Sequence, residues 1–109
     1  MNQRVIPMPM TRKRMYELTV IFTPVLKEKG LSTAINSVES LIKKHKGKVS
    51  EVENEGKQKL AYPIQKYREG IYVFWKTILP REQVNAFEAA LKLQKGNLRH
   101  LLVATEETV

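Results

Sequence analysis

The spacing of hydrophobic residues changes along the chain, and each change predicts an element. Residues 15–22 alternate between apolar and polar positions, which predicts a half-buried strand that ends before Pro24. Its apolar face contains Tyr16, Leu18, Val20 and Phe22. A helical spacing follows, which begins between Lys27 and Ser32 and ends at Gly47. The residues at this spacing are Leu31, Ile35, Val38, Leu41 and Ile42.

The rest of the chain predicts four more elements. Residues 48–64 are predicted to form either one long strand or a strand with a bulge near Gly56. A polar turn over 66–70 precedes a strand over 71–78, which is rich in aromatic and β-branched residues. A helix then begins near Pro80 and ends near Gly96, and its apolar positions are Val84, Phe87, Ala90 and Leu91. The last strand covers 97–105.

The order β-α-β-β-α-β predicts an α+β, ferredoxin-like fold. Right-handed crossovers place both helices on one face of a four-stranded antiparallel sheet and leave the other face open. We expect one domain over 14–105, a mobile basic N-terminal arm over 1–13 and a short tail over 106–109.

The strand over 71–78 is apolar on both faces, so its pattern does not identify the core side. We assign Tyr72 and Phe74 to the core. The open face then carries Ile71, Val73 and Trp75, an apolar patch that favours a partner protein. Alternatively, a loop or the N-terminal arm covers this patch.

Charge and composition narrow the classes of function. The 109 residues contain 19 Lys and Arg against 11 acids, all Glu, for a net charge of +8. This excess favours a polyanionic partner, although it also improves solubility. No apolar run approaches the roughly 20 residues of a membrane span. Cysteine is absent, which excludes disulfides and thiolate metal sites.

Catalytic patterns are missing from the sequence. His45 and His100 belong to different predicted elements, and no spacing of His and Glu suggests a metal site. The alternating Glu51, Glu53 and Glu55 are interpreted as a solvated edge. The segment "REGIYVFW" resembles the RNA-recognition consensus, but Ile71 and Val73 occupy its base-stacking positions. We therefore expect RNA contacts from basic edges and no base stacking on the sheet, no enzyme activity and no cofactor.

Three stretches carry a resemblance to a known family. They are "MYE" at 15–17, "GKQKLAYPIQK" at 56–66 and "NLRHLLV" at 97–103. Together with the element order, they resemble the bacterial small-subunit ribosomal protein six family. The resemblance implies a non-catalytic protein of the cytoplasmic ribosome, bacterial rather than organellar. It also implies binding to the central domain of small-subunit rRNA as a heterodimer with small-subunit ribosomal protein eighteen.

The expected RNA contacts are basic residues at edges and turns. The resemblance implies contacts from Arg12, Lys13, Arg14, Arg99 and His100, where His100 replaces a common arginine. The exposed basic edge beside "LAYPI" adds Lys57, Lys59, Lys66 and Arg68. The expected partner contacts are Ile71, Val73, Trp75 and Tyr62, although Tyr62 is also compatible with core packing.

Two other functions compete with the ribosomal one. The open face is compatible with a non-ribosomal protein-interaction module. A small enzyme or metabolite-binding regulator on the same fold would need a convergent polar pocket, because ferredoxin-like domains support many functions.

Overall fold

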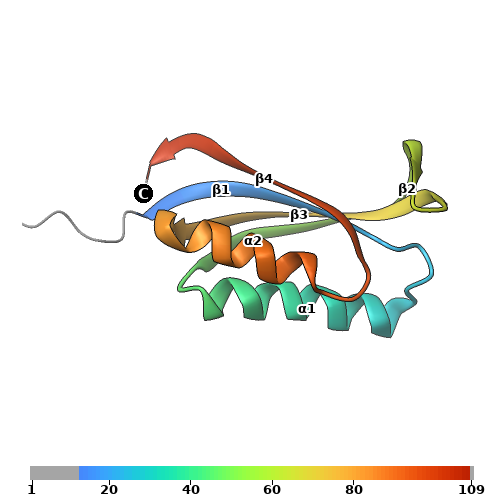
Figure 1. Ribbon diagram of the computed structural model, residues 1–109, viewed down its shortest axis with the longest axis horizontal. Helices are drawn as coiled ribbons and strands as arrows, with labels where there is room; N and C mark the ends of the chain where they lie inside the picture. The colour runs from blue at the N-terminus through green and yellow to red at the C-terminus, as the bar shows by residue number, and fades with distance from the viewer. Residues whose placement is uncertain (1–12, 109) are drawn as a thin grey trace, which may run out of the picture.

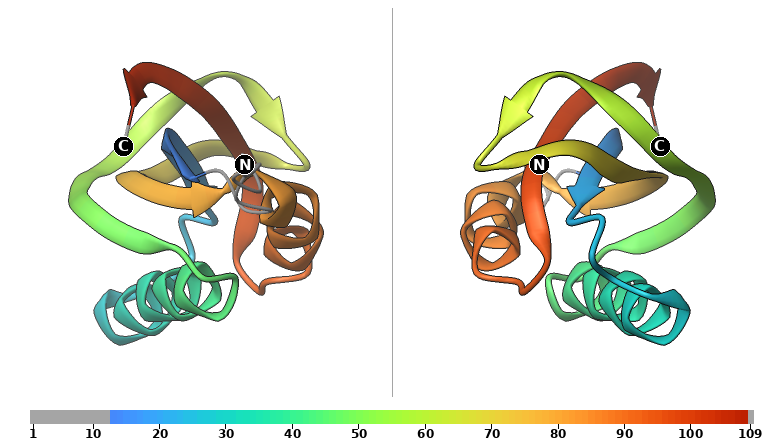
Figure 2. Two further views of the ribbon diagram at one scale, coloured as in Figure 1. Left: turned by 90° about the vertical axis from the view of Figure 1, so that its left-hand side faces the viewer. Right: turned by 90° about the vertical axis from the view of Figure 1, so that its right-hand side faces the viewer.

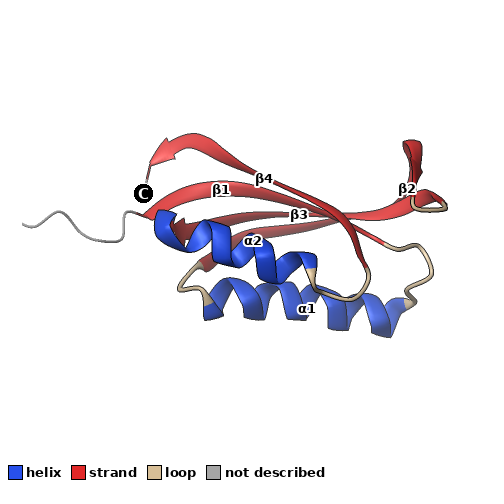
Figure 3. Cartoon of the chain, viewed as in Figure 1, coloured by secondary structure: helices blue, strands red, loops and turns tan. Residues whose placement is uncertain are grey.

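A computed structural model describes residues 13–108 of the chain, which form one sheet covered by two helices (Figures 1 and 3). The elements, in order, are β1 Lys13–Phe22, α1 Glu28–Lys44, β2 Lys48–Ile64, β3 Tyr67–Pro80, α2 Val84–Lys92 and β4 Asn97–Thr108. A short 3-10 turn, Arg81–Gln83, precedes α2. The strand order is β2-β3-β1-β4, and every neighbouring pair is antiparallel. The ferredoxin-like prediction is confirmed.

The core lies between the sheet and the helices. β1 contributes its predicted face to the core, since Leu18, Val20 and Phe22 are fully buried. From the helices, Val38, Ile42, Phe87 and Leu91 pack against them. The predicted periodicities of both helices are therefore confirmed, and no helix of residues 13–108 covers the opposite face of the sheet (Figure 3).

The predicted orientation of β3 is wrong. Ile71, Val73 and Trp75 are buried in the core, and Trp75 keeps only 1% of its surface exposed. The Trp75 indole Nε1 donates a hydrogen bond to Glu39 Oε2 of α1 at 3.0 Å. Phe74 is 37% exposed and lies on the open face. The larger Trp75 buries more apolar surface, and α1 supplies the hydrogen bond that its buried indole requires.

The hairpin between β2 and β3 is longer than predicted. The turn contains only Gln65 and Lys66, so residues 67–70 of the predicted turn belong to β3. Gln65 adopts the left-handed conformation, with φ of 60°. The bulge predicted near Gly56 is present, with φ of 80° and a hydrogen bond from the Gly56 amide to the Asn54 side chain.

The two ends of the predicted domain differ in their agreement with the structure. β4 continues to Thr108, three residues further than predicted. Lys13 begins β1, whereas the rest of the predicted arm, residues 1–12, lies outside the described residues.

Candidate nucleic-acid interface and partner face

The predicted basic residues lie at two separate ends of the sheet. Lys13 and Arg14 begin β1, and Arg14 donates to the carbonyl of Thr105 at 3.5 Å. The other basic residues cluster near the end of β1, beside the β2–β3 turn. Because β1 has ten residues that each rise about 3.4 Å, the two groups are roughly 30 Å apart. Arg12 lies outside the described residues.

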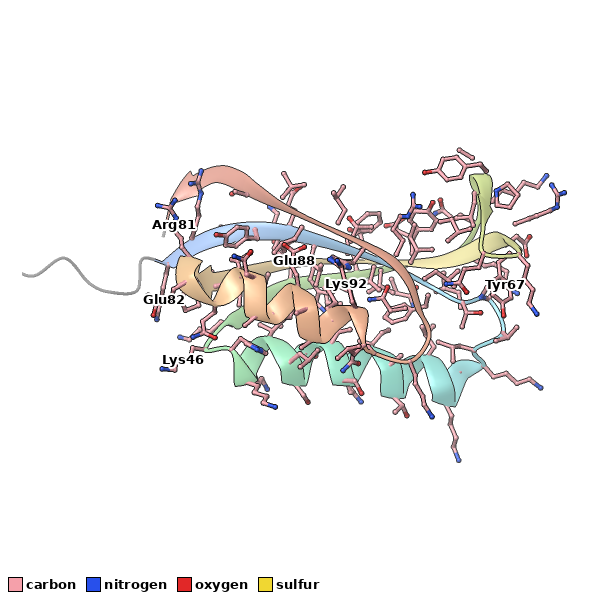
Figure 4. All side chains as sticks on the ribbon, viewed as in Figure 1. Lys46, Tyr67, Arg81, Glu82, Glu88 and Lys92 are labelled. Carbon is pink, nitrogen blue, oxygen red and sulfur yellow. The ribbon has the colours of Figure 1, made fainter. Side chains whose placement is uncertain are left out.

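We call the second group the hairpin end, and define it as Lys57, Lys59, Tyr62, Lys66, Tyr67, Arg68 and Arg99. A cavity of about 530 Å³ at this end is lined by Lys59, Lys66 and Arg68, with Glu69 as its one acid. Tyr67, labelled at this end of the molecule in Figure 4, also lines the cavity. The Lys66 Nζ lies 6.0 Å from the centre of the Tyr67 ring. Cations from three strands therefore gather at one end of the sheet.

Tyr62 connects this cluster to the other edge of the sheet. Its side chain is 57% exposed, so its predicted alternative of core packing is wrong. The Arg99 Nη1 of β4 donates a hydrogen bond to the Tyr62 hydroxyl at 2.5 Å. The Arg99 guanidinium carbon also lies 5.5 Å from the ring centre, within the range of a cation–π contact.

His100 does not belong to this exposed edge. Its side chain is only 9% exposed and points to the helix side of the sheet. The His100 Nε2 lies 2.9 Å from Glu88 Oε1 of α2, which is labelled in Figure 4. The alternation of β4 places neighbouring side chains on opposite faces, so Arg99 faces outward and His100 inward. The predicted phosphate contact at His100 therefore lacks an accessible side chain.

The middle of the open face has a different chemistry. Pairing across the sheet aligns one row of Glu51, Lys76, Glu17 and Val103. The next row contains Glu53, Phe74, Thr19 and Leu101. We call these eight residues the open-face patch. Three glutamates and one lysine give the patch a net negative charge within a chain of +8.

The open-face patch is also apolar and slightly hollow. Leu101 is 61% exposed and Val103 is 46% exposed, although both are hydrophobic. A depression of about 260 Å³ is lined by Phe74, Lys76 and the three glutamates of the patch. The neighbouring Glu55 raises the pKa of Glu53, first through a hydrogen bond between the carboxyl groups and then through its charge. Exposed apolar side chains beside carboxylates are typical of a protein-binding surface.

The open-face patch replaces most of the predicted partner set. Ile71, Val73 and Trp75 are in the core, and of the predicted partner residues only Tyr62 is exposed. The sequence pattern led to Phe74 being assigned to the core, and Leu101 and Val103 were not singled out. Glu51 and Glu53 were interpreted only as part of a solvated edge. One signal was available, because the run "LLV" at 101–103 is apolar on both faces of its strand.

Metal and membrane sites find no support within residues 13–108. Among these residues, no three His, Cys, Asp or Glu side chains lie close enough together to hold a metal ion. No described helix has the length and apolar character needed to cross a membrane.

Comparison with known proteins finds relatives over most of the chain. A model of the family described as ribosomal protein S6 matches residues 15–104. The small ribosomal subunit protein bS6 of Dictyoglomus turgidum is 34% identical over 94 residues, which cover 86% of this chain and 97% of that protein. The bS6 protein of Mycobacterium tuberculosis is 33% identical over 94 residues, which cover 86% and 98%.

A solved structure shares the fold and much of the length. The 30S ribosomal protein S6 of Thermotoga maritima superposes with a TM-score of 0.80 at 25% identity. The superposition covers 86% of this chain and 89% of that one.

Proposed function

This chain belongs to the bacterial ribosomal protein S6 family, and from that premise we propose that it binds the central domain of small-subunit rRNA together with small-subunit ribosomal protein eighteen. Family membership places the protein in the small subunit of the cytoplasmic ribosome. Its role there is structural and non-catalytic.

The observation that carries the RNA part of the proposal is the gathering of cations at the hairpin end. Lys59, Lys66 and Arg68 surround one cavity, and Arg99 of the far edge strand contacts Tyr62 of the same hairpin. Such a cluster neutralises several phosphates and releases their counterions, which makes the affinity depend steeply on salt. Lys13 and Arg14 add a second, distant group that reaches another segment of the same RNA.

The partner part of the proposal rests on the open-face patch. An apolar surface with Phe74 at its centre suits a protein partner, and the carboxylates around it select a partner with Lys or Arg side chains. RNA is a poor occupant of this patch because its phosphates would meet Glu17, Glu51 and Glu53. We therefore assign protein eighteen to the patch and RNA to the hairpin end.

The RNA assignment is tested by a salt series of binding to a central-domain rRNA fragment, with protein eighteen present. The variant Lys59→Gln/Lys66→Gln/Arg68→Gln should bind more weakly. Its slope of log affinity against log salt should fall by about 1 for each lost contact. Lys29→Gln is the matched control, because Lys29 is exposed on α1, on the helix side of the molecule. An unchanged slope in the triple variant would contradict the assignment.

A second candidate is a protein-interaction module outside the ribosome, favoured by the exposed Phe74 and Leu101. Sedimentation separates the two functions. A ribosomal protein should co-sediment with small subunits and leave them at high salt, whereas an unrelated module should remain in the free fraction at every salt concentration.

A further inference from the structure

The last part of β2 leaves the sheet and arches over its open face. Lys59 pairs with Glu69 and Ile64 with Tyr67, so four residues of β2, 60–63, stand opposite Arg68 alone. Pro63 lies in this bulge and cannot donate a backbone hydrogen bond to a neighbouring strand. Both views in Figure 2 show the arch passing above the sheet toward β4. The bulge therefore carries Tyr62 from one edge strand toward the other.

Gly70 leaves the space in which the arch packs against the sheet. A Cβ atom at Gly70 would lie 2.4 Å from the Cγ2 of Ile21 and 3.5 Å from the Cδ2 of Leu60. The missing side chain thus leaves room for Leu60 of the arch beside Ile21 of β1. This packing holds residues 60–63 over the sheet independently of Tyr62.

Tyr62 and Arg99 meet across the whole width of the sheet. β2 and β4 are its two edge strands, with β3 and β1 between them. The hydrogen bond from Arg99 to the Tyr62 hydroxyl fixes the direction of the ring, yet more than half of the side chain remains exposed. Leu60 already anchors the arch, so packing of the arch does not require an exposed aromatic ring at position 62.

We propose that the Tyr62 ring is a stacking platform for an unpaired nucleobase of the bound RNA. This inference rests on the proposed RNA-binding function and deepens it. Every base has a π-face, and stacking on an oriented aromatic ring contributes without reading the sequence. Arg99 holds the ring by its hydroxyl, while Lys59, Lys66 and Arg68 bind the phosphates beside the stacked nucleotide.

Charge distinguishes this ligand from a protein segment. The cavity that Leu60 of the arch helps to line has three cations and one acid in its lining, the reverse of the open-face patch. An RNA loop supplies both a flat base for Tyr62 and phosphates for the cations. The earlier expectation that no base stacks on this protein concerned the sheet, and Tyr62 lies above it.

The test compares two substitutions of similar size at the same position. Tyr62→Phe keeps the aromatic face and loses the hydroxyl, whereas Tyr62→Leu loses the aromatic face. Affinity for a central-domain rRNA fragment is measured with protein eighteen present, at one salt concentration and across a series. Single 2-aminopurine substitutions in the unpaired positions of the fragment report stacking by quenched fluorescence. Thermal melting of each variant confirms that it is folded.

The proposal expects Tyr62→Phe to bind within about threefold of the unchanged protein. Tyr62→Leu should lose roughly 5- to 150-fold in affinity, with the salt slope unchanged, because stacking is worth about 1–3 kcal/mol per base. One 2-aminopurine position should be quenched by the unchanged protein and by Tyr62→Phe only. Equal affinity and equal quenching for Phe and Leu would overturn the stacking platform while RNA binding stands. Loss of salt-dependent binding by the unchanged protein would instead overturn the proposed function itself.

Discussion

The hairpin end adjoins the open-face patch along the sheet but has the opposite charge. Along β3, Phe74 and Lys76 lie among glutamates, whereas residues 68–70 lie beside the lysines of the hairpin. The boundary is a third row across the sheet. It contains Gly56, Tyr72 and Ile21, and it ends on β4 at Arg99 of the hairpin end.

This difference shows why a net charge of +8 is a poor guide to a particular surface. An overall field attracts RNA to the molecule, but local carboxylates decide where RNA cannot bind. In the proposed assignment, the two surfaces hold RNA and a basic protein at the same time without competing.

The largest effect on stability is expected when an aromatic residue of the core is replaced by alanine, compared with the same change at an aromatic residue of the open face. Trp75→Ala should lower the free energy of unfolding by about 3–5 kcal/mol, because it leaves a cavity beneath α1 and an unpaired Glu39. Phe74→Ala should cost less than about 1 kcal/mol of stability, since the ring is partly in solvent, and should weaken binding of protein eighteen. Chemical denaturation and pull-down measure both effects. Similar losses of stability in the two variants would contradict the assignment of faces.

The same pair of residues shows what the sequence could and could not predict. The pattern of β1 identified its buried side directly, because the polar Glu17 and Thr19 alternate with apolar residues in the middle of the strand. In β3 both faces are apolar, so orientation depended on a contact 36 positions away, from Trp75 to Glu39. The spacing of apolar residues alone carries no information about such a distant hydrogen-bond acceptor.

The candidate sites follow the same rule. The lysines beside "LAYPI" are exposed as predicted, because lysine side chains are rarely buried unless they are paired. His100 was expected on the exposed edge with Arg99, but neighbouring residues of a strand face opposite sides. His100 therefore faces α2, where Glu88 pairs with it. The separation of the cations into two ends and the arch over Gly70 depend on strand register, which composition does not encode.

The second largest effect is expected at the boundary between the two surfaces. Gly70→Ala should lower the free energy of unfolding by about 1–3 kcal/mol, because its Cβ would overlap Ile21. Displacement of Leu60 should also free Tyr62 from Arg99 and weaken RNA binding, while binding of protein eighteen changes little. Ile21→Ala removes the overlapped atom, so the double variant should be less destabilised than the sum of the two single variants. Simple additivity would mean that the arch does not rest on this contact.

A smaller effect is expected from the carboxylates of the open-face patch. Glu51→Gln/Glu53→Gln should slow association with protein eighteen and reduce the salt dependence of that association, with stability nearly unchanged. Association kinetics at two salt concentrations measure this change. Glu28→Gln on the exposed first turn of α1 is the control. Faster binding of RNA by the double variant is also expected, because the patch would no longer repel phosphates, and slower binding would contradict the separation.

The smallest effect is a pH response confined to the acidic surface. Glu55 raises the pKa of Glu53 above its ordinary 4.5, so the folded protein binds this proton more tightly than the unfolded chain does. The resulting stabilisation is present below pH 4.5 and is lost as the pH rises through the raised value. The hairpin cations do not titrate in this range, so mild acid should weaken binding of protein eighteen before it affects RNA binding. Carboxyl NMR should show that Glu55→Gln lowers the pKa of Glu53, whereas an unchanged titration would mean that the two side chains act independently.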